Sequence, residues 1–550
     1  MLAVPHLRQA RRVLLLYPEF PVTYWGLQHS LPVLGRKAFM PPLGLITLAA
    51  LCPPEFEHRL VDLNCRPLRD EDLEWAELVC ISGMLIQKRS MRRLAERCRA
   101  AGKLVVAGGP YPTALPEEVQ GFCDVVVTGE AEVTWPQFLA DLEAGSLRAL
   151  YRSDEKPDMQ RSPTPRYDLL RVEDYLTIAV QFSRGCPFQC EFCDIIVMFG
   201  RRPRTKSGAQ IRAELDAIRR TGFQGDIFFV DDNFIGDKRK ALEIVETIRA
   251  WNAETGAPYE YSTEASLDLA QKPDLLAAMV AAGFRRVFLG IESPSAASLQ
   301  ETKKFQNLRA SLEESVGTIV GAGLNVMAGF IIGFDSDPEE IAQLQIDLIS
   351  RLPIPLAVVS RLEAAPGTPL WARMEAAGRL LPERADDEPG AVGNTNIAPL
   401  KPPLEALRDY RRVLEAIYAP EAYFARVRAA NLRAPRPATL RARLRSLWRP
   451  LKISLQYSRG PLALLRFVRG LPPDFRRAAL RLGLSLLWRR PDRLGLLMGY
   501  VALGNHVHRY TWEQVLPQLD EQLRALEAAT PPQEPAPVVP APRRPLPVAS

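Results

Sequence analysis

The fold of this chain is constrained most by a regular alternation of short apolar runs with helical stretches. Within residues 11–145 the apolar runs are Val13–Tyr17, His58–Leu63, Leu78–Ser82, Leu104–Ala107 and Asp124–Thr128. Helical segments such as Leu43–Leu51 and Lys88–Ala101 lie between them. Short buried strands that alternate with helices form a parallel, doubly wound sheet. We therefore predict an α/β fold whose first domain spans residues 1–145.

The same alternation continues after a connector at residues 146–175. Six further β/α units follow within residues 176–370, with candidate strands at Thr177–Ser183, Asp226–Asp231, Glu260–Thr263, Arg286–Gly290, Asn325–Gly333 and Ala357–Leu362. Six units predict an open, partial (β/α)6 barrel, because a closed barrel of this kind has eight. The active sites of such barrels lie at the carboxyl ends of the strands. Polar residues that follow these strands are therefore candidate site residues.

The C-terminal part of the chain is helical and basic. We expect a helical extension at residues 371–425, with a loop at Ala385–Pro399, and an Arg- and Leu-rich helical region at 426–529. Residues 421–510 hold 19 Arg or Lys against 3 Asp or Glu, although the whole chain has a formal net charge of only +6. Pieces such as Leu440–Leu451 and Phe475–Trp488 can form amphipathic helices. The proline-rich composition of residues 530–550 predicts a disordered tail.

Three roles remain open for this basic region. Its leucines can face the barrel as a helical cap, or its basic amphipathic helices can lie on an anionic membrane surface through residues 439–504. Nucleic-acid binding is the third role. Because aromatic residues are sparse there and no RNA-binding module is recognisable, we expect no nucleic-acid partner.

Cysteine usage and the absence of targeting signals indicate a reducing compartment. The chain has no run of 18 apolar residues and no small-residue cleavage site after its N-terminal apolar stretch, so we expect neither a membrane span nor a signal peptide. Eight cysteines in so long a chain do not indicate a disulfide framework. We expect a cytoplasmic protein whose membrane association, where it occurs, is peripheral.

Three of the cysteines are clustered directly after the first predicted barrel strand. The run RGCPFQCEFC at residues 184–193 places Cys186, Cys190 and Cys193 at the spacing C-x3-C-x2-C. Three thiolates can ligate three irons of a [4Fe–4S] cluster and leave the fourth iron open for reaction. The alternatives are a structural zinc site or a chance grouping. A zinc site requires a fourth Cys or His at short spacing, and the five histidines of the chain are distant in sequence.

This motif, with the aromatic Phe192 before its last cysteine, resembles the signature of the radical SAM superfamily. The resemblance implies that the open iron chelates the amino and carboxylate groups of S-adenosylmethionine (SAM). Electron transfer into the sulfonium then releases methionine and a hydrogen-abstracting 5′-deoxyadenosyl radical. It also implies an external electron donor of the flavodoxin or ferredoxin type.

Other residues of the predicted barrel fall where that family binds SAM, at the ends of successive strands. Asp231 and Asp232 stand where the family has Gly-Gly-Glu, and a carboxylate there can accept charge-assisted hydrogen bonds from the SAM ammonium. The remaining expected SAM contacts are Phe192, Ser262, Glu264, Glu292 and Gly333. Taken singly, each is equally explained as a capped strand end or an ordinary turn.

The first domain resembles the Rossmann-like cobalamin-binding domain that precedes the barrel in one radical SAM class. The resemblance is carried by Met40–Leu45, Ser82–Met84, Gly108–Pro110 and Thr128–Glu132. The Asp-x-His-x-x-Gly motif of many cobalamin proteins is absent, which implies binding without a protein histidine as axial ligand. A domain of this fold that binds nothing is the alternative. The expected cobalamin contacts are Ser82, Gly83, Gln87, Gly108, Gly109, Thr128, Gly129 and Glu130.

Within that class the chain is most similar to the subgroup with a helical C-terminal extension, which includes the hopanoid C-2 methylases. The matching pieces include Cys186–Ile195 and Phe229–Gly236, while Leu85 stands where a His is expected. The resemblance implies a cobalamin-dependent C-methyltransferase that acts on an unactivated sp3 carbon, with a hopanoid-like lipid as a substrate. One alternative is a radical SAM cyclase or rearrangement enzyme with the same cofactors. Another is a non-catalytic iron–sulfur or zinc protein with a sensing or scaffold role.

Overall fold

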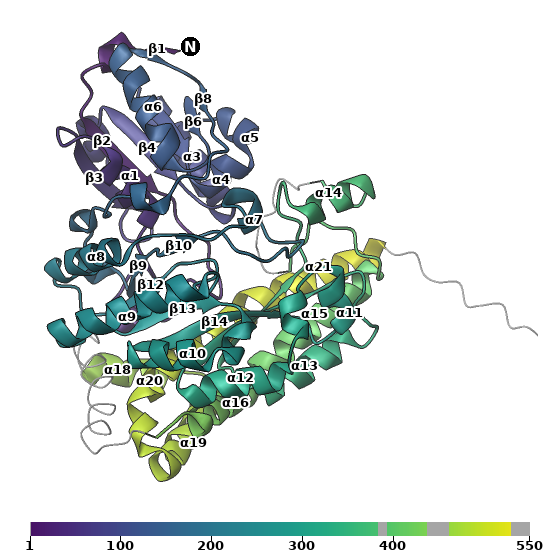
Figure 1. Ribbon diagram of the computed structural model, residues 1–550. Coiled ribbons are helices and arrows are strands. Elements are labelled where there is room, and N and C mark those ends of the chain that lie inside the picture. The colour runs from purple at the N-terminus through teal and green to yellow at the C-terminus, as the bar shows by residue number, and fades with distance from the viewer. Residues whose placement is uncertain (1, 383–392, 437–460, 530–550) are drawn as a thin grey trace, which may run out of the picture.

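The computed structural model describes residues 2–382, 393–436 and 461–529 (Figure 1). The predictions for Leu440–Leu451, for most of the loop at Ala385–Pro399 and for the tail at 530–550 fall wholly or partly outside the described residues.

The first domain is a parallel six-stranded sheet covered by helices on both faces. The sheet has the order β3-β2-β4-β5-β6-β8, with β2 Arg12–Tyr17, β3 Glu57–Asp62, β4 Leu78–Ser82, β5 Leu104–Gly108, β6 Val125–Val127 and β8 Leu150–Tyr151. The helices are α1 Leu43–Leu51, α2 Asp70–Trp75, α3 Lys88–Ala100, α4 Pro110–Ala114, α5 Pro116–Gln120 and α6 Ala131–Ala144. Two short strands, β1 Leu2–Ala3 and β7 Ser146–Leu147, pair antiparallel. This confirms the predicted doubly wound domain.

Strand β2 shows why the apolar runs of this domain are continuous. Val13 and Leu15 pack into the core under α1 and α6, whereas Leu14 and Leu16 pack into the core under α3. A strand that is buried on both faces has no polar side to show, so its sequence reads as an unbroken apolar run.

The second domain is an open barrel of six parallel strands in the order β16-β15-β14-β13-β12-β9, as predicted. These strands are β9 Thr177–Val180, β12 Asp226–Phe229, β13 Tyr261–Ala265, β14 Phe284–Glu292, β15 Asn325–Ile332 and β16 Leu356–Arg361. The outer helices are α8 Gly208–Arg220, α9 Lys238–Thr255, α10 Pro273–Ala281, α11 Ala296–Glu301, α12 Leu312–Ala322 and α13 Ile341–Arg351. The first predicted strand is interrupted. It leaves the sheet after Val180, and Ser183 belongs to a separate ribbon of β10 Ser183–Arg184 and β11 Arg204–Thr205.

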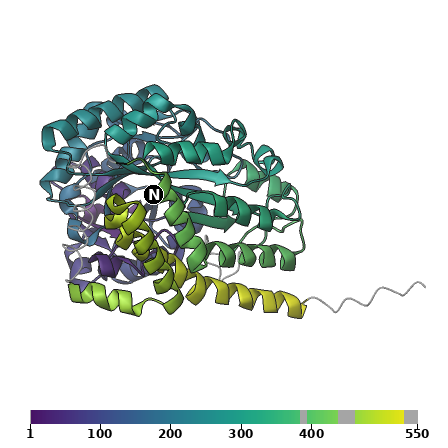
Figure 2. The ribbon, with the colours of Figure 1, turned by 90° about the horizontal axis from the view of Figure 1, so that it is seen from below.

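The C-terminal region packs against the barrel as a helical cap and runs across its underside (Figure 2). Short helix α14 Pro369–Ala376 follows the last strand. The cap itself consists of α15 Pro403–Tyr418, α16 Pro420–Arg433, α18 Pro461–Gly470, α19 Pro473–Arg489, α20 Leu497–Tyr510 and α21 Leu516–Ala529. Its side chains Tyr410, Ile417, Val507 and Leu519 join the main core of the barrel.

The cap also donates hydrogen bonds to backbone carbonyls at the free edge of the barrel sheet. An edge strand presents unpaired carbonyls, and those of β16 accept from the cap: Tyr410 donates to Val359 O at 3.1 Å and Tyr418 to Ala357 O at 2.5 Å. The buried Arg426 guanidinium donates through Nε to Ile354 O at 3.0 Å. An open barrel of six strands is therefore completed by tyrosines and an arginine where a closed barrel would have another strand.

The opposite edge, at β9, is covered from the N-terminal side. Tyr167 of the connector donates to Ala179 O at 3.0 Å. The segment that links β2 to α1 pairs with the start of this strand, because Thr177 N donates to Phe39 O at 3.0 Å. The same segment reaches the cap, where the Tyr24 hydroxyl lies 3.0 Å from that of Thr511.

We predict that the double variant Tyr410→Phe with Tyr418→Phe unfolds at lower denaturant concentration than wild type. Each change leaves a buried edge carbonyl without its donor, which costs about 1–3 kcal/mol. The control is Tyr259→Phe, because Tyr259 is equally buried but stacks on Trp251. Chemical denaturation followed by circular dichroism measures the difference. Equal midpoints for the double variant and the control would contradict this account of the sheet edge.

Candidate active site

The three clustered cysteines lie in a loop held at its base by the β10–β11 ribbon. The loop spans residues 185–203 and begins at the carboxyl end of the first barrel strand. Gly185 has φ +92°, and a Cβ there would lie 2.8 Å from Gly200 O, so only glycine fits at the start of the loop. Cys186 N donates to the same carbonyl at 3.3 Å. The two ends of the loop are thus held against each other.

The thiols are free and surrounded by donors. Asn233 Nδ2 lies 3.8 Å from Cys186 Sγ, and Gln306 Nε2 lies 3.5 Å from Cys190 Sγ. Burial raises the pKa of Cys193 to about 12, and the nearby charge of Asp194 adds to this rise. Such a thiol keeps its proton until a metal replaces it.

The number of thiols fits a cluster better than a single zinc ion, which takes four ligands. Cys190 is close enough to perturb the pKa values of both Cys186 and Cys193. A [4Fe–4S] cluster takes one thiolate per iron, so its ligands stand farther apart than those of one zinc ion. Three cysteines without a fourth ligand are the donor set that such a cluster with one open iron requires.

Three carboxylates gather at the ends of β12 and β13 beside this loop. Asp231 accepts from the Ser183 hydroxyl at 2.5 Å, and Asp232 accepts from Gly185 N at 3.2 Å. Burial raises the pKa of Asp231 to about 7, of Asp232 to about 6 and of Glu264 to about 8. In Glu264 the charges of the two aspartates add to the effect. Within the described part of the chain none of the three forms a salt bridge, and Asp231 also accepts from the backbone N–H of Phe182 at 3.2 Å.

The other predicted SAM contacts interact with neighbouring groups of the barrel. Ser262 is buried and donates to Ile227 O at 3.5 Å, while Phe192 lies with its ring centroid 6.2 Å from that of Phe334. Gly333 has φ +106°, and its N–H donates to Asp337 at 2.8 Å.

Glu292 is already paired in this arrangement. Its carboxylate accepts from Lys304 Nζ at 2.7 Å, and its backbone is strained at φ +67°. A Cβ at Gly290 would lie 2.4 Å from Glu292 Oε1, so glycine makes room for the pair. The Lys304 ammonium also lies 5.8 Å from the centroid of the Phe192 ring. This places one positive charge beside the cysteine loop.

Three residues of this site were missed by the sequence analysis. Asn233 follows the two aspartates at a strand end, and that position was a usable signal. Lys304 precedes and Gln306 lies in the short 3-10 helix Phe305–Leu308 after α11, with no motif around them. Only folding brings that segment against Cys190, so no pattern in the sequence indicates it.

The predicted cobalamin contacts collect at the carboxyl edge of the first sheet, which faces the barrel (Figure 1). The chain reverses its winding between β2 and β4, and ligands of such sheets bind at this switch point. Ser82, Gly83 and Gly108 lie at the ends of β4 and β5. A Cβ at Gly109, which has φ +98°, would lie 2.3 Å from the Ser82 hydroxyl. The close approach of the Ser82 side chain therefore requires glycine at position 109.

The polar residues among the predicted cobalamin contacts form hydrogen bonds to other groups of the first domain. Gln87 donates to Pro18 O at 2.6 Å and accepts from Met84 N at 2.9 Å. Thr128 N donates to Tyr151 O at 2.8 Å, which aligns the end of β6.

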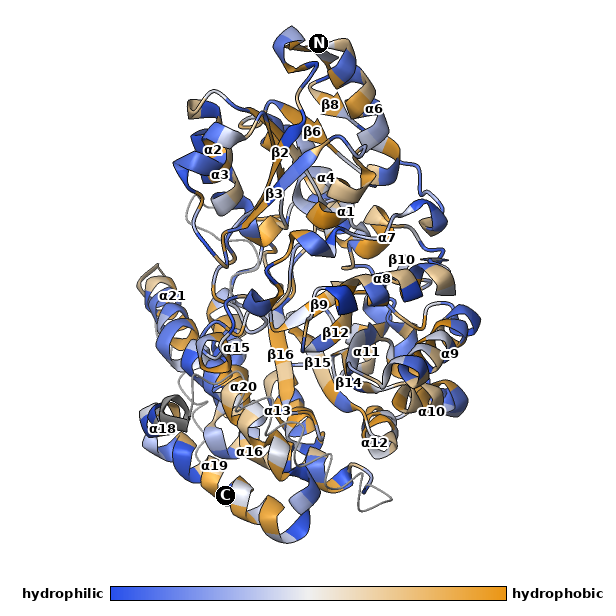
Figure 3. Ribbon diagram, turned by 90° about the vertical axis from the view of Figure 1, so that its left-hand side faces the viewer, coloured by the Kyte–Doolittle hydropathy of each residue, from blue (hydrophilic) through white to orange (hydrophobic). Residues whose placement is uncertain are grey.

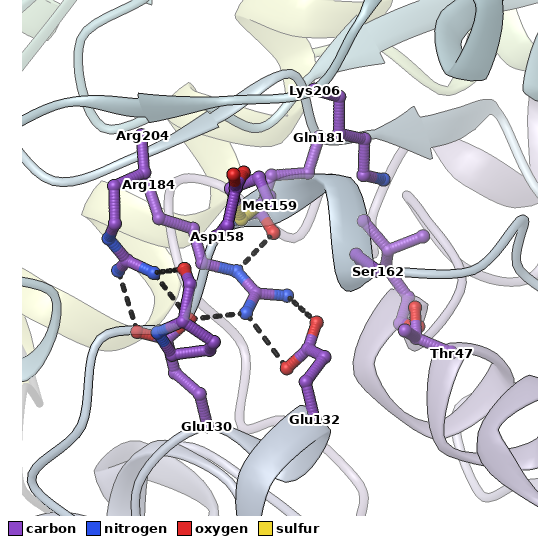
Figure 4. Close-up of polar contacts among 12 residues, drawn as sticks. Thr47, Glu130, Glu132, Asp158, Met159, Ser162, Gln181, Arg184, Arg204 and Lys206 are labelled. Carbon is purple, nitrogen blue, oxygen red and sulfur yellow. Dashed lines mark hydrogen bonds and ion pairs between the residues drawn. The ribbon is translucent and has the colours of Figure 1, made fainter.

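At Gly129 and Glu130 the same edge meets the connector and the barrel. A Cβ at Gly129 would lie 2.3 Å from Ser153 O. The Glu130 carboxylate is held by Arg184 and Arg204 of the barrel (Figure 4). Direct contact of Glu130 with cobalamin stays a prediction.

Several apolar side chains face the barrel interior and are only half-buried. Along β14, Val287 and Leu289 are buried against the helices, whereas Phe288 between them is only half-buried and faces inward. The same alternation leaves Phe228, Met327 and Val358 half-buried on the inner side of β12, β15 and β16. Trp25 packs edge-on against Phe288 at 5.0 Å between ring centroids, and Phe39 lies 6.4 Å from Phe228. We call this set of six side chains the lumen wall.

Three protein-family models match the chain. The B12 binding domain matches residues 32–139, the Radical SAM superfamily matches 180–345, and a domain of unknown function (DUF4070) matches 368–518. These limits agree with the first sheet, the open barrel and the helical cap.

Among proteins of similar sequence, an uncharacterized methyltransferase of Synechocystis sp. is 44% identical over 419 residues, which cover 76% of this chain and 77% of that protein. The hopanoid C-2 methylase of Rhodopseudomonas palustris is 35% identical over 422 residues, which cover 76% and 79%.

Solved structures share the fold at low identity. The cobalamin-dependent SAM radical enzyme OxsB, with aqua-cobalamin and SAM bound, gives a TM-score of 0.58 at 15% identity and covers 94% of this chain and 81% of that chain. The radical SAM methyltransferase TsrM of Kitasatospora setae, with cobalamin and a [4Fe–4S] cluster bound, gives 0.56 at 16% identity and covers 86% and 99%. This chain therefore belongs to the cobalamin-binding radical SAM methyltransferases, the family that includes the hopanoid C-2 methylase.

Proposed function

We propose that this enzyme methylates an unactivated sp3 carbon of an apolar polycyclic isoprenoid, such as a hopanoid. The observation that carries the proposal is the lumen wall, which offers aromatic and aliphatic surface where a polar substrate would need hydrogen-bonding groups. Gly329 leaves room for the Phe288 ring of this wall, because a Cβ at position 329 would lie 3.0 Å from that ring and would displace it. The 35% identity to the hopanoid C-2 methylase supports the same substrate class.

The residues of the site divide the work between them. Cys186, Cys190 and Cys193 would ligate three irons, and Asp232 with Glu264 would hold the SAM ammonium beside the open iron. When bound, the cluster and SAM supply hydrogen abstraction and cobalamin supplies the methyl group. The lumen wall would then hold the target carbon against the cofactors and keep water away from it.

We predict that reconstituted wild-type enzyme, reduced anaerobically with SAM, forms 5′-deoxyadenosine, and that Cys190→Ala does not. Glu264→Gln should keep its iron but bind SAM about tenfold more weakly, because a charge-assisted hydrogen bond is lost. Mass spectrometry of 5′-deoxyadenosine over a range of SAM concentrations measures product formation and SAM binding, and iron analysis measures the cluster content of each variant. The control is Cys98→Ala, which removes a buried thiol from α3.

The substrate is tested in the same reaction with a pentacyclic hopanoid hydrocarbon. Methylation adds one carbon and two hydrogens to the product mass, and S-adenosylhomocysteine forms as well. A product of unchanged carbon number would favour a cyclase or rearrangement enzyme. A wild-type enzyme with full iron content that forms no 5′-deoxyadenosine would refute the radical chemistry.

A lipid substrate requires access to a membrane, and we propose that α19 provides it. Ala478, Leu482 and Leu486 of this helix are buried in the cap, but its outer side carries apolar residues as well. Those outer side chains are Leu480, Leu484, Leu487 and Trp488, the last 84% exposed. The exposed arginines Arg477 and Arg489 flank them. A helix with apolar residues and arginines on its free face fits an anionic bilayer surface.

The position of α19 agrees with peripheral binding. It lies at the end of the molecule opposite the cobalamin domain (Figure 3). No helix among the described residues is long and apolar enough to cross a membrane. We therefore propose contact with the surface of the bilayer only.

We predict that Leu484→Ser with Trp488→Ala reduces binding to phosphatidylglycerol vesicles by at least about tenfold, because two exposed apolar side chains no longer enter the interface. Flotation of enzyme with vesicles measures the bound fraction. Leu242→Ala, a change at an exposed leucine on α9, is the control. Unchanged flotation of the double variant would exclude α19 as the contact.

The electron donor is proposed to dock at a basic hollow beside the cysteine loop. The hollow has a volume of about 660 Å³ and is lined by Arg202, Pro203, Thr205, Gly236, Asp237, Lys238, Arg239 and Lys240. Gly236 lies against the loop, since a Cβ there would be 3.3 Å from Pro187 Cδ. An acidic flavodoxin or ferredoxin would meet complementary charge close to the cluster.

We predict that Arg202→Glu with Arg239→Glu slows cluster reduction by flavodoxin about tenfold at low salt, because like charges now face each other. Reduction by dithionite should be unchanged, since a small reductant needs no docking surface. Stopped-flow absorbance measures both rates. Arg220→Glu, at the far end of α8, is the control, and an equal loss with dithionite would point to damage of the cluster loop.

A further inference from the structure

A buried network of two carboxylates and two guanidinium groups joins the cobalamin domain to the base of the cysteine loop (Figure 4). Arg184 Nη1 donates to Glu130 Oε2 at 2.6 Å, and its two terminal nitrogens reach both oxygens of Glu132 at 3.0 and 2.9 Å. Arg204 holds Glu130 through both terminal nitrogens, at 3.0 and 2.6 Å. The side chains of the carboxylates are 2% and 4% exposed.

The two arginines occupy matched positions on either side of the loop. Arg184 pairs with Arg204 across the β10–β11 ribbon, so one precedes Cys186 by two residues and the other follows the loop. Their further contacts fix them from the barrel side: Arg184 Nε donates to Gln181 at 2.9 Å, and Arg204 donates to Phe199 O at 3.2 Å. The carboxylates are thus bonded to arginines at both ends of the cysteine loop.

The two glutamates belong to the first domain. Glu130 follows Gly129 at the carboxyl end of β6, and Glu132 lies in the first turn of α6. They therefore belong to the backbone edge at which the cobalamin glycines lie. The network connects the two cofactor edges through four charged side chains and no flexible linker.

We propose that Glu130, Glu132, Arg184 and Arg204 are positioning residues that set the spacing and orientation of the cobalamin edge relative to the cluster. The proposal rests on the proposed methyl transfer, which needs both cofactors to act on one carbon. A buried ion pair adds little net stability compared with apolar packing, because desolvation of the charges is costly. Bidentate arginine–carboxylate pairs do, however, define direction and distance. Geometry is therefore the property that this network supplies and that apolar packing would not.

The test uses the reconstituted holoenzyme with cobalamin and the cluster both in paramagnetic states. Pulsed electron paramagnetic resonance measures the dipolar coupling between the two spins and needs no substrate. We expect a narrow distribution of couplings in the wild type, a broadened one in Glu132→Gln, and an intermediate one in Glu132→Asp, which keeps the charge at a shorter reach. Arg204→Lys keeps the charge but loses the bidentate geometry, and should broaden the distribution too.

A matched control separates positioning from stability. Asp72→Asn removes a buried carboxylate that Arg66 holds in a bidentate pair at 2.6 and 2.9 Å, entirely within the cobalamin domain. It should lower the melting temperature but leave the spin coupling unchanged. A wild-type coupling distribution in Glu132→Gln and Arg204→Lys, whatever their melting temperatures, would overturn the proposal.

A second readout follows the consequence for the reaction. With the hopanoid probe, the yield of methylated product per 5′-deoxyadenosine should fall about tenfold or more in Glu132→Gln, because small misplacements of reacting groups cost large factors in rate. If the wild type does not methylate the probe, the proposed substrate fails. The spin coupling still decides the present proposal in that case.

Discussion

The architecture depends on one constraint: a parallel sheet of six strands curls into a barrel but cannot close it. Two strand edges and an interior remain to be satisfied, and buried backbone groups without partners are costly. The helical cap meets the edge at β16 with Tyr410, Tyr418 and Arg426. The connector and the segment before α1 meet the edge at β9. The cap and the first domain thus stabilise the barrel. Because each covers one edge of the same sheet, both lie around the barrel interior.

The incomplete barrel also determines where charge can be placed. Asp232 and Glu264 lie at the carboxyl ends of the strands, where burial raises their pKa values. The Lys304 ammonium lies close to the thiols of the cysteine loop. Exclusion of water thus favours a cation beside the carboxylates and would favour a metal cluster at the thiols. Because burial disfavours an unpaired charge, it also favours a bound group of opposite charge.

Much of this could be predicted from the sequence where local pattern and tertiary role coincide. Strand β4 was predicted with the observed bounds because a doubly buried strand must be apolar throughout, and the cysteine spacing is a local motif. Prediction failed where the partner lies far away in sequence. Nothing near Gln306 indicates Cys190, and nothing near Tyr410 indicates the carbonyl of Val359. The first barrel strand was predicted too long because Ser183 has strand-like neighbours, whereas its backbone N–H turns to the Asp231 carboxylate.

The interior of the barrel combines an apolar wall with polar closure at both ends. At the lower end Arg286 pairs with Asp226 at 2.5 Å, and Tyr500 of the cap donates to Asn325 at 3.3 Å. At the upper end stand the carboxylates and the cysteine loop. An apolar molecule in the lumen would therefore contact the middle of the strands. The polar groups at the two ends would limit its position along the barrel, because contact with them would remove their water without replacing its hydrogen bonds. Under the proposed function, such a chamber would orient a rigid hydrocarbon without hydrogen bonds to it. The choice of carbon would then depend on shape and on how firmly the cofactor edges above it are held.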